Sequence, residues 1–339
     1  MVVAIHSRGG LWHAWAELDD TARSPVTAVF FALTRAGTEW VLVFFVLSGF
    51  LVGGRVAERV SNHTFDIKRY AIDRITRIFT PFIPALLWSA LVACIIGGSV
   101  SWLEFAGNLI GLQGVFVNAF AGNFPLWSLA YEIWFYVLAG AVAFFYTESG
   151  IRRIFAGFTI VLALAIFTKL SVVFLFTWLI GGATYWLLSK PRNILMGWSV
   201  FILAGIGYIL SQLTSETVSI DLSLWQQFMP SNDVAILILA LGIALCLPVL
   251  SHWRPVSLVL QAVNRAGAGL AAFSYTLYLT HYPLLYLWEY YFPERYTTLG
   301  GDALAVYILR IASCVLFAWL LYLPFERQTG KLRGFLGNR

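Results

Sequence analysis

The sequence predicts an all-α protein that crosses a lipid bilayer many times as one helix bundle. Of its 339 residues, 60% are hydrophobic and only 12% are charged, against about a quarter charged in ordinary soluble domains. The apolar residues gather into runs long enough to cross a membrane. The net charge of +5 lies in the connectors between these runs. Soluble and nucleic-acid-binding proteins are therefore excluded, because so few charges suit a surface that faces lipid.

The apolar runs predict nine full membrane spans in chain order. The runs lie near residues 39–54, 81–98, 126–146, 154–169, 171–188, 194–211, 233–251, 272–292 and 303–324. The short apolar stretch before His6 resembles the end of a helix that arrives from the cytoplasm, so we expect a truncated first span in addition. A short outer tail is the alternative. The whole chain, 1–339, reads as a single transmembrane domain with no separate soluble domain.

The distribution of Lys and Arg predicts the orientation of the bundle, because cytoplasmic connectors are enriched in these residues. With the connector after the first full span inside the cell, sixteen of the 22 basic residues are cytoplasmic and five are external, while Arg310 lies within a span. The C-terminus is then expected in the cytoplasm. The three cysteines stand far apart in apolar runs, without the spacing of a disulfide framework or a metal site.

The connector 65–79 predicts an amphipathic helix at the cytoplasmic surface, with Asp66 as its N-cap and Pro81 at the entry to the next span. Arg74 and Arg77 are three residues apart and share one face, so they could grip a ligand that carries phosphate groups. Anchoring to acidic lipid headgroups is the alternative, and the segment by itself favours it.

Glu132 lies inside a predicted span, in Trp127-Ser-Leu-Ala-Tyr-Glu132. A carboxylate at bilayer depth is expensive, so it is a candidate functional group by default. Ser128 lies one helical turn before it on the same side. A purely structural hydrogen bond is the alternative role for Glu132.

Two histidines are further candidates. Ser274, Tyr278, His281 and Leu285 form a stripe at helical spacing, which should face protein or water rather than lipid. His281 taken alone is more typical of a helix–helix contact than of a ligand contact. His6 stands near a span end, where a neutral imidazole can act as the general base for a hydroxyl group.

Several of these segments together resemble the acyltransferase-3 family of bacterial integral-membrane acyltransferases. They are the apolar run that ends in His6, Phe44-Phe-Val-Leu-Ser-Gly-Phe-Leu51, Arg74-Ile-Thr-Arg-Ile-Phe79, Trp127–Glu132, Ser274–Pro283 and Phe325-Glu-Arg327. The family has about ten membrane helices. Its essential His is matched by His6, whereas the Arg that precedes that His by ten intervening residues has no counterpart. Arg327 stands where the closing motif usually has Pro.

The resemblance implies transfer of an acyl group, usually acetyl in the family, from cytoplasmic acyl-CoA to a hydroxyl of a cell-surface or exported carbohydrate or glycolipid. It implies His6 as base and Glu132 as the group that positions the acceptor or stabilises the imidazolium. Arg74 and Arg77 would hold CoA phosphates, and Ser128, Tyr278 and His281 would line the substrate path.

The expected partners are acyl-CoA, the acceptor glycan and membrane lipid of the bacterial inner membrane. No permanently bound cofactor, metal or nucleic acid is expected. Two alternatives stay open: a transporter or flippase for a polysaccharide precursor, and an inactive acyltransferase that lacks its first span. The sequence does not specify the acceptor, the acyl group or the oligomeric state.

Overall fold

The computed structural model describes residues 1–188, 199–214 and 229–337. It is 81% helical, and the described residues contain no β-strand, which confirms the predicted all-α class. Six helical stretches among them are long and apolar enough to cross a membrane: Pro25–Ser61, Ile67–Ile95, Phe124–Thr147, Gly150–Lys169, Asn232–Ser251 and Gly301–Gly337. The count of nine or ten spans stays a prediction. The predicted span 194–211 lies partly outside the described residues.

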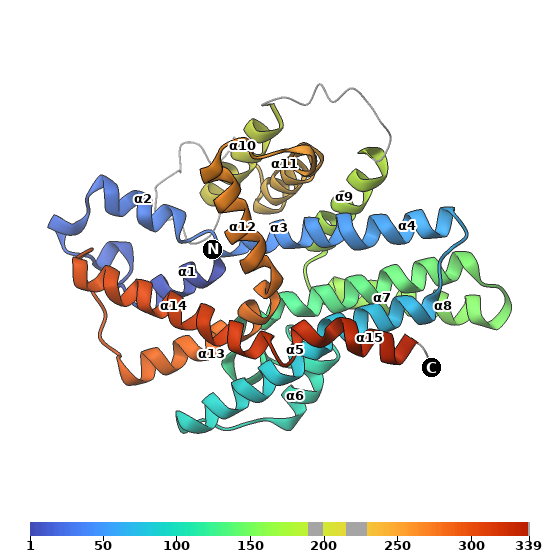
Figure 1. Ribbon diagram of the computed structural model, residues 1–339, viewed down its shortest axis with the longest axis horizontal. Helices are drawn as coiled ribbons and strands as arrows, with labels where there is room; N and C mark the ends of the chain where they lie inside the picture. The colour runs from blue at the N-terminus through green and yellow to red at the C-terminus, as the bar shows by residue number, and fades with distance from the viewer. Residues whose placement is uncertain (189–198, 215–228, 338–339) are drawn as a thin grey trace. The chain divides into compact units, whose positions relative to one another are not determined.

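The chain divides into two compact units, each made from separate stretches of sequence. Unit 1 comprises Met1–Gly37, Lys68–Ala130 and Pro255–Arg339. Its helices are α1 (Val2–Gly9), α2 (Pro25–Leu33), α5 (Ile67–Ile95), α6 (Trp102–Leu109), α12 (Leu258–Ala272), α13 (Ser274–Tyr291), α14 (Gly301–Tyr322) and α15 (Thr329–Gly337) (Figure 1). Helices α13 and α14 lie side by side, and α1 packs against both.

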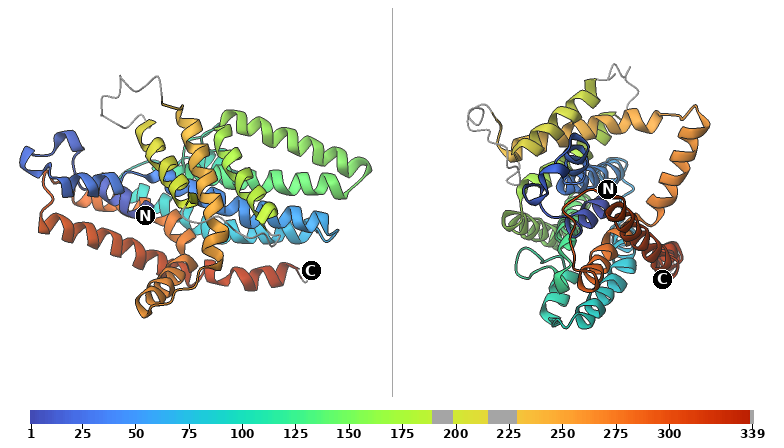
Figure 2. Two further views of the ribbon diagram at one scale, coloured as in Figure 1. Left: turned by 90° about the horizontal axis from the view of Figure 1, so that it is seen from above. Right: turned by 90° about the vertical axis from the view of Figure 1, so that its left-hand side faces the viewer.

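Unit 2 comprises Thr38–Ile67 and Tyr131–Arg254. Its helices are α3 (Gly37–Ser48), η3 (Gly49–Gly53), α4 (Gly54–Ser61), α7 (Trp127–Thr147), α8 (Gly150–Lys169), α9 (Val172–Leu188), α10 (Ser199–Thr214) and α11 (Asn232–His252). Helices α10 and α11 form a close antiparallel pair, which is visible in both views of Figure 2. As predicted, α8 and α9 are joined by a short connection around Leu170.

Pro81, which was predicted at the entry to a span, lies inside a helix that joins the surface segment to that span. Helix α5 runs without interruption from Ile67 to Ile95 and contains both Pro81 and Pro84. Each proline removes one backbone hydrogen bond, but Ile78, Phe82, Ala85 and Leu86 are buried in unit 1. Their packing holds the helix together, as neighbouring helices commonly do for proline in membrane proteins. Arg74 and Arg77 therefore lie on the same rigid helix as the apolar span.

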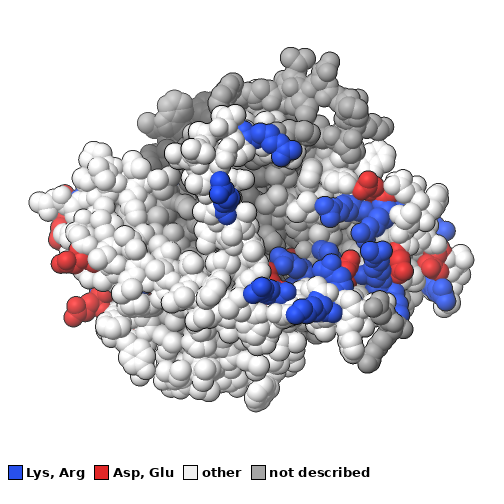
Figure 3. All heavy atoms as spheres, in the orientation of Figure 1, with Lys and Arg blue, Asp and Glu red and all other residues white. Residues whose placement is uncertain are grey.

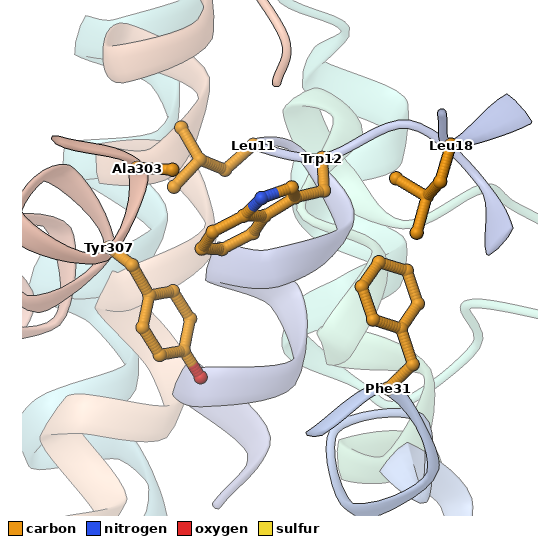
Figure 4. Close-up of a cluster of buried hydrophobic side chains, with 6 residues drawn as sticks. All are labelled: Leu11, Trp12, Leu18, Phe31, Ala303 and Tyr307. Atoms are coloured by element: carbon orange, nitrogen blue, oxygen red, sulfur yellow. The ribbon is translucent and has the colours of Figure 1, made fainter. Parts of the chain in front are cut away.

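An aromatic cluster fixes the chain directly after α1. Trp12 is 1% exposed and packs with Leu11, Leu18, Phe31, Ala303 and Tyr307, as Figure 4 shows. The indole Nε1–H of Trp12 donates to the carbonyl of Thr298 at 2.9 Å, and the Tyr307 hydroxyl donates to the carbonyl of Ala4 at 3.0 Å. A buried indole needs such a partner. These contacts hold the short helix α1, which carries His6, against α14.

In unit 2, the segment Phe44–Leu51 packs very closely against α9 through glycine residues. Helix α3 ends in the π-helical turn η3, and a Cβ at Gly49 would overlap the backbone carbonyl of Trp178 on α9. A Cβ at Gly181 would in turn overlap the carbonyl of Val46. Small residues of this kind allow two membrane helices to approach closely. The close approach places Ser48 beside the indole of Trp178, whose Nε1 lies 3.3 Å from the Ser48 hydroxyl.

Candidate active site

The centre of unit 1 holds a pair of histidines. The Nδ1 atom of His6 on α1 lies 2.8 Å from the Nε2 atom of His281 on α13. The two ring planes are within 3° of parallel and the ring centroids are 5.1 Å apart, which is compatible with an N–H···N bond between the ring edges. His281 is fully buried, whereas His6 is partly accessible. Two residues 275 positions apart in sequence thus meet inside the unit.

The surroundings of His281 determine which nitrogen carries each proton. Its Nδ1 atom lies 2.8 Å from the carbonyl oxygen of Tyr278 and 3.1 Å from that of Leu277. Carbonyl oxygens only accept, so Nδ1 of His281 is the protonated nitrogen and its Nε2 is an acceptor. His6 therefore donates its Nδ1–H to His281. The remaining nitrogen of His6, Nε2, carries a lone pair that is available to accept a proton.

Pro283 interrupts the backbone hydrogen bonding of α13 close to His281, and a side chain from elsewhere in unit 1 replaces the missing donor. The proline has no N–H for the carbonyl of Leu279, four residues earlier. The side-chain amide of Asn123 donates to that carbonyl instead, at 3.0 Å. The indole of Trp88 lies 3.3 Å from the next carbonyl, that of Thr280. Two side chains from other parts of unit 1 thus hold the backbone on either side of His281.

The structure also brings Ser128 and Tyr278 together. Their hydroxyl oxygens are 2.7 Å apart, and the Tyr278 hydroxyl donates to the carbonyl of Pro125 at 2.7 Å. The ring of Tyr278 lies beside that of His281, with 6.0 Å between the ring centroids. This network ties the start of α7 to α13 at the depth of the histidine pair. The expectation that these hydroxyls line the substrate path stays a prediction.

Glu326 binds the N-terminal turn of α13. It is buried, and one of its carboxylate oxygens accepts from the backbone N–H and the hydroxyl of Thr276, at 3.1 and 2.6 Å. The other oxygen accepts from Arg77 at 2.7 Å. A carboxylate at a helix N-terminus is favoured by the exposed N–H groups and by the helix dipole. The closing motif of the sequence thus fixes the position of Arg77.

A basic region surrounds this ion pair. Figure 3 shows Lys and Arg side chains gathered over α5 and α15. Arg333 on α15 pairs with Asp73 on α5 at 3.0 Å, so the C-terminal helix lies against the start of α5. Arg74 lies one turn from Tyr70 on α5 and interacts with it electrostatically. The two arginines that the sequence singled out therefore share one face, but Arg77 is already engaged by Glu326.

Glu132 belongs to a separate network in unit 2. It is buried and accepts a hydrogen bond of 2.6 Å from the Tyr136 hydroxyl. The hydroxyl of Ser48 lies 3.5 Å from that of Tyr136. The chain from Trp178 through Ser48 and Tyr136 to Glu132 joins two of the segments on which the resemblance rests. A catalytic role for Glu132 stays a prediction.

An apolar cavity of about 690 Å³ lies elsewhere in unit 2, between α4, α7 and α9. Val56, Leu138 and Trp178 are among the residues that line it. Its lining contains no acidic or basic side chain and no histidine. This cavity suits an acyl chain or a lipid tail rather than acid–base chemistry.

Comparison with known proteins decides the family. The acyltransferase-3 family model, described as an acyltransferase domain, matches residues 1–323 of the 339. The chain belongs to the acyltransferase-3 family. No curated protein and no solved structure matches it. The match covers both histidines of the pair, and Glu326 of the closing motif lies just beyond it.

Some residues of this acyltransferase-3 site escaped the sequence analysis. Asn123 and Trp88 were not predicted, although Pro283 inside a span signals a free carbonyl that needs a donor. Glu326 was noted only as part of a motif. His281 was expected to line the substrate path or to make a helix contact, and its pairing with His6 was not foreseen. Two histidines so far apart in sequence give no local pattern that would join them.

Proposed function

We propose that this protein is a membrane O-acyltransferase of the bacterial inner membrane, with its C-terminus in the cytoplasm. It moves an acyl group, acetyl in the simplest case, from cytoplasmic acyl-CoA to a hydroxyl of a cell-surface or exported carbohydrate. The family match supports the reaction class. The observation that carries the proposal is the His6–His281 pair, in which Nε2 of His6 is free to accept a proton.

The reaction follows from that geometry. Nε2 of His6 takes the proton of the acceptor hydroxyl while the hydroxyl oxygen attacks the thioester carbonyl carbon. The carbon–sulfur bond breaks, the acyl group stays on the acceptor oxygen, and the CoA sulfur leaves with the proton that His6 had taken. Throughout, the Nδ1–H of His6 donates to His281, which holds the ring in place and shares the charge of the imidazolium. A carboxylate plays this part in the Ser-His-Asp triad.

The basic region of unit 1 is the proposed donor site. Arg74 and Arg77 would contact the CoA phosphates, because guanidinium groups make strong, charge-assisted bonds to phosphate. Glu326 holds Arg77 at 2.7 Å and at the same time caps α13. Donor binding is therefore coupled, through α13, to the end of the helix that carries His281.

Removal of both arginines tests the donor site. We expect the Arg74→Ala, Arg77→Ala double variant to bind acyl-CoA at least about 100-fold more weakly, since two lost bonds to charged groups, at about 1.5–3 kcal/mol each, remove about 3 kcal/mol or more. Binding of radiolabelled acetyl-CoA to purified protein measures the effect. The double variant Lys68→Ala, Arg69→Ala is the matched control, because both residues are exposed on α5 and their loss removes the same two positive charges. Wild-type affinity in the Arg74→Ala, Arg77→Ala variant would refute the phosphate clamp.

Glu132 is proposed as a second catalytic group, which positions the acceptor or stabilises the imidazolium. Glu132→Gln keeps an oxygen that can accept from Tyr136 but removes the negative charge. We expect acyl transfer to fall at least about 10-fold while the protein inserts and purifies normally. Tyr136→Phe is the control, because it removes the 2.6 Å hydrogen bond and leaves the charge. Equal losses in the two variants, or full activity in Glu132→Gln, would show a structural role instead.

A further inference from the structure

We infer that Tyr282, Tyr286 and Glu289 on α13 form the subsite that binds the acceptor, and that it takes a neutral sugar ring with adjacent hydroxyls. This inference rests on the proposed function. None of the three residues was singled out in the sequence. The ring of Tyr282 contacts both histidines, whereas Tyr286 and Glu289 lie farther along the helix. They follow one another at helical spacing, so they share one side of α13.

The proposed donor site, the histidine pair and the proposed acceptor subsite follow one another along helix α13. Thr276, which binds Glu326 beside Arg77, lies five residues before His281. Glu289 lies eight residues after it. At 1.5 Å per residue these separations are about 8 and 12 Å. The proposed donor site and the proposed acceptor subsite thus lie toward opposite ends of one helix, with the histidine pair between them.

The two tyrosines form an aromatic wall that begins at His6. The ring of Tyr282 meets that of His6 edge-on, with 5.0 Å between centroids and an interplanar angle of 82°. Tyr286 continues the wall at 5.0 Å from Tyr282, and the two hydroxyl groups interact through a hydrogen bond. Both side chains are only partly buried. Aromatic rings of this kind can cover the C–H face of a sugar, while their hydroxyl groups bond its oxygens.

A loop before α7 closes the other side of this wall. A Cβ at Gly122 would lie 3.3 Å from the ring of Tyr286, and Gly122 has a φ of +70°. Ala121 just before it also has a positive φ, 51°. Such backbone is costly for a residue other than glycine and is concentrated at functional sites. Phe124 then meets Tyr282 edge-on at 6.0 Å.

Glu289 supplies the hydrogen-bond acceptor of the subsite. Its carboxylate packs against Gly10, where a Cβ would overlap it. Gly10 follows His6 by four residues, so the carboxylate and the imidazole lie toward the same side of α1. A carboxylate accepts hydrogen bonds through two oxygens. It therefore suits two neighbouring hydroxyls of a sugar and repels a phosphate.

Arg310 on α14 accounts for the presence of this carboxylate within the bundle. Its side chain is fully buried, and its three guanidinium nitrogens have no hydrogen-bond partner among the described residues. Its guanidinium interacts electrostatically with Glu289 and lies 5.8 Å from the ring centroid of Trp288. A buried charge needs an opposite charge nearby. Arg310 thus offsets the charge of Glu289 through an electrostatic interaction, and we assign the carboxylate oxygens to hydroxyls of the acceptor.

The test separates acceptor binding from donor binding in four variants. Glu289→Gln removes the negative charge and one of the two acceptor oxygens, and the double variant Tyr282→Phe, Tyr286→Phe removes the two hydroxyl groups of the subsite. Gly10→Ala displaces the Glu289 carboxylate, which its Cβ would overlap, without changing any charge. Tyr290→Phe is the matched control, because Tyr290 lies on the same helix and is 54% exposed. Each variant is purified for binding of radiolabelled acetyl-CoA. Each is also expressed in a deletion strain, whose exported glycan is analysed for ester-linked acyl groups.

We expect the three subsite variants to bind acetyl-CoA within about twofold of wild type and to lower glycan acylation about 10- to 100-fold. Tyr290→Phe should change neither quantity. Wild-type glycan acylation in Glu289→Gln would overturn the subsite, as would a parallel loss of acetyl-CoA binding. If the proposed function itself is wrong, the wild-type protein will neither bind acetyl-CoA nor add acyl esters to the glycan. This result is distinct from any effect of the variants.

Discussion

His6→Ala is expected to reduce acyl transfer about 100- to 10,000-fold, the range that a positioned general base contributes. The methyl group cannot take the hydroxyl proton, and His281 does not replace His6 because it is fully buried, so its Nε2 does not reach the acceptor hydroxyl. Acetyl-CoA binding should stay near the wild-type value, since the proposed phosphate contacts lie at the other end of α13. The measurement is release of CoA from acetyl-CoA by purified protein in the presence of an acceptor glycan extract.

The control for this variant is His13→Ala. His13 lies beyond the end of α1 and pairs at 3.3 Å with Glu17, outside the histidine pair. It should transfer acyl groups at the wild-type rate. A His6→Ala protein that inserts normally and matches wild type in CoA release would eliminate His6 as the base. A loss of acetyl-CoA binding in His6→Ala would place His6 in the donor site instead.

His281→Ala is expected to lower kcat about 100-fold or more while the KM for acetyl-CoA changes little. The reason is the 2.8 Å contact between Nδ1 of His6 and Nε2 of His281. Without that acceptor, the imidazole of His6 can rotate and exchange its two tautomers. The nitrogen of His6 that faces the acceptor hydroxyl is then not always the unprotonated one, so it cannot always accept the proton.

Two further variants distinguish positioning from packing. His281→Gln offers an amide oxygen to the Nδ1–H of His6 and should recover part of the lost kcat. Thr280→Val removes a hydroxyl that donates to the carbonyl of Thr276 at 2.8 Å in the same helix, without touching His6, and should keep kcat. If His281→Ala lowered kcat and acetyl-CoA binding together and glutamine gave no recovery, His281 would be a packing residue only.

The fold class was predictable because hydrophobic runs of membrane length report directly on burial in lipid. The continuity of α5 through Pro81 was not predictable in this way. Local rules treat proline as a helix terminator, whereas packing around Phe82 keeps α5 continuous. The helix α12 also arose in a stretch that was expected to be a connector.

The site was predictable only in part. Isolated polar groups in apolar runs, such as His6, Glu132 and His281, are visible in sequence because their burial demands an explanation. Their partners are not visible. The contact of Arg77 with Glu326 joins residues 249 positions apart, and no spacing rule spans such a separation. The same is true of Glu289, which becomes noteworthy only when Gly10 and the buried Arg310 are seen beside it.

The account as a whole depends on a histidine-based transfer of acyl groups to an exported glycan. The most direct test compares the glycan of a deletion strain that carries the wild-type gene, the His6→Ala gene or no gene, with mild base used to release ester-linked acyl groups. The account predicts that these groups are present with wild type and absent from the other two strains. Identical glycans in all three strains, or full restoration by His6→Ala, would contradict it.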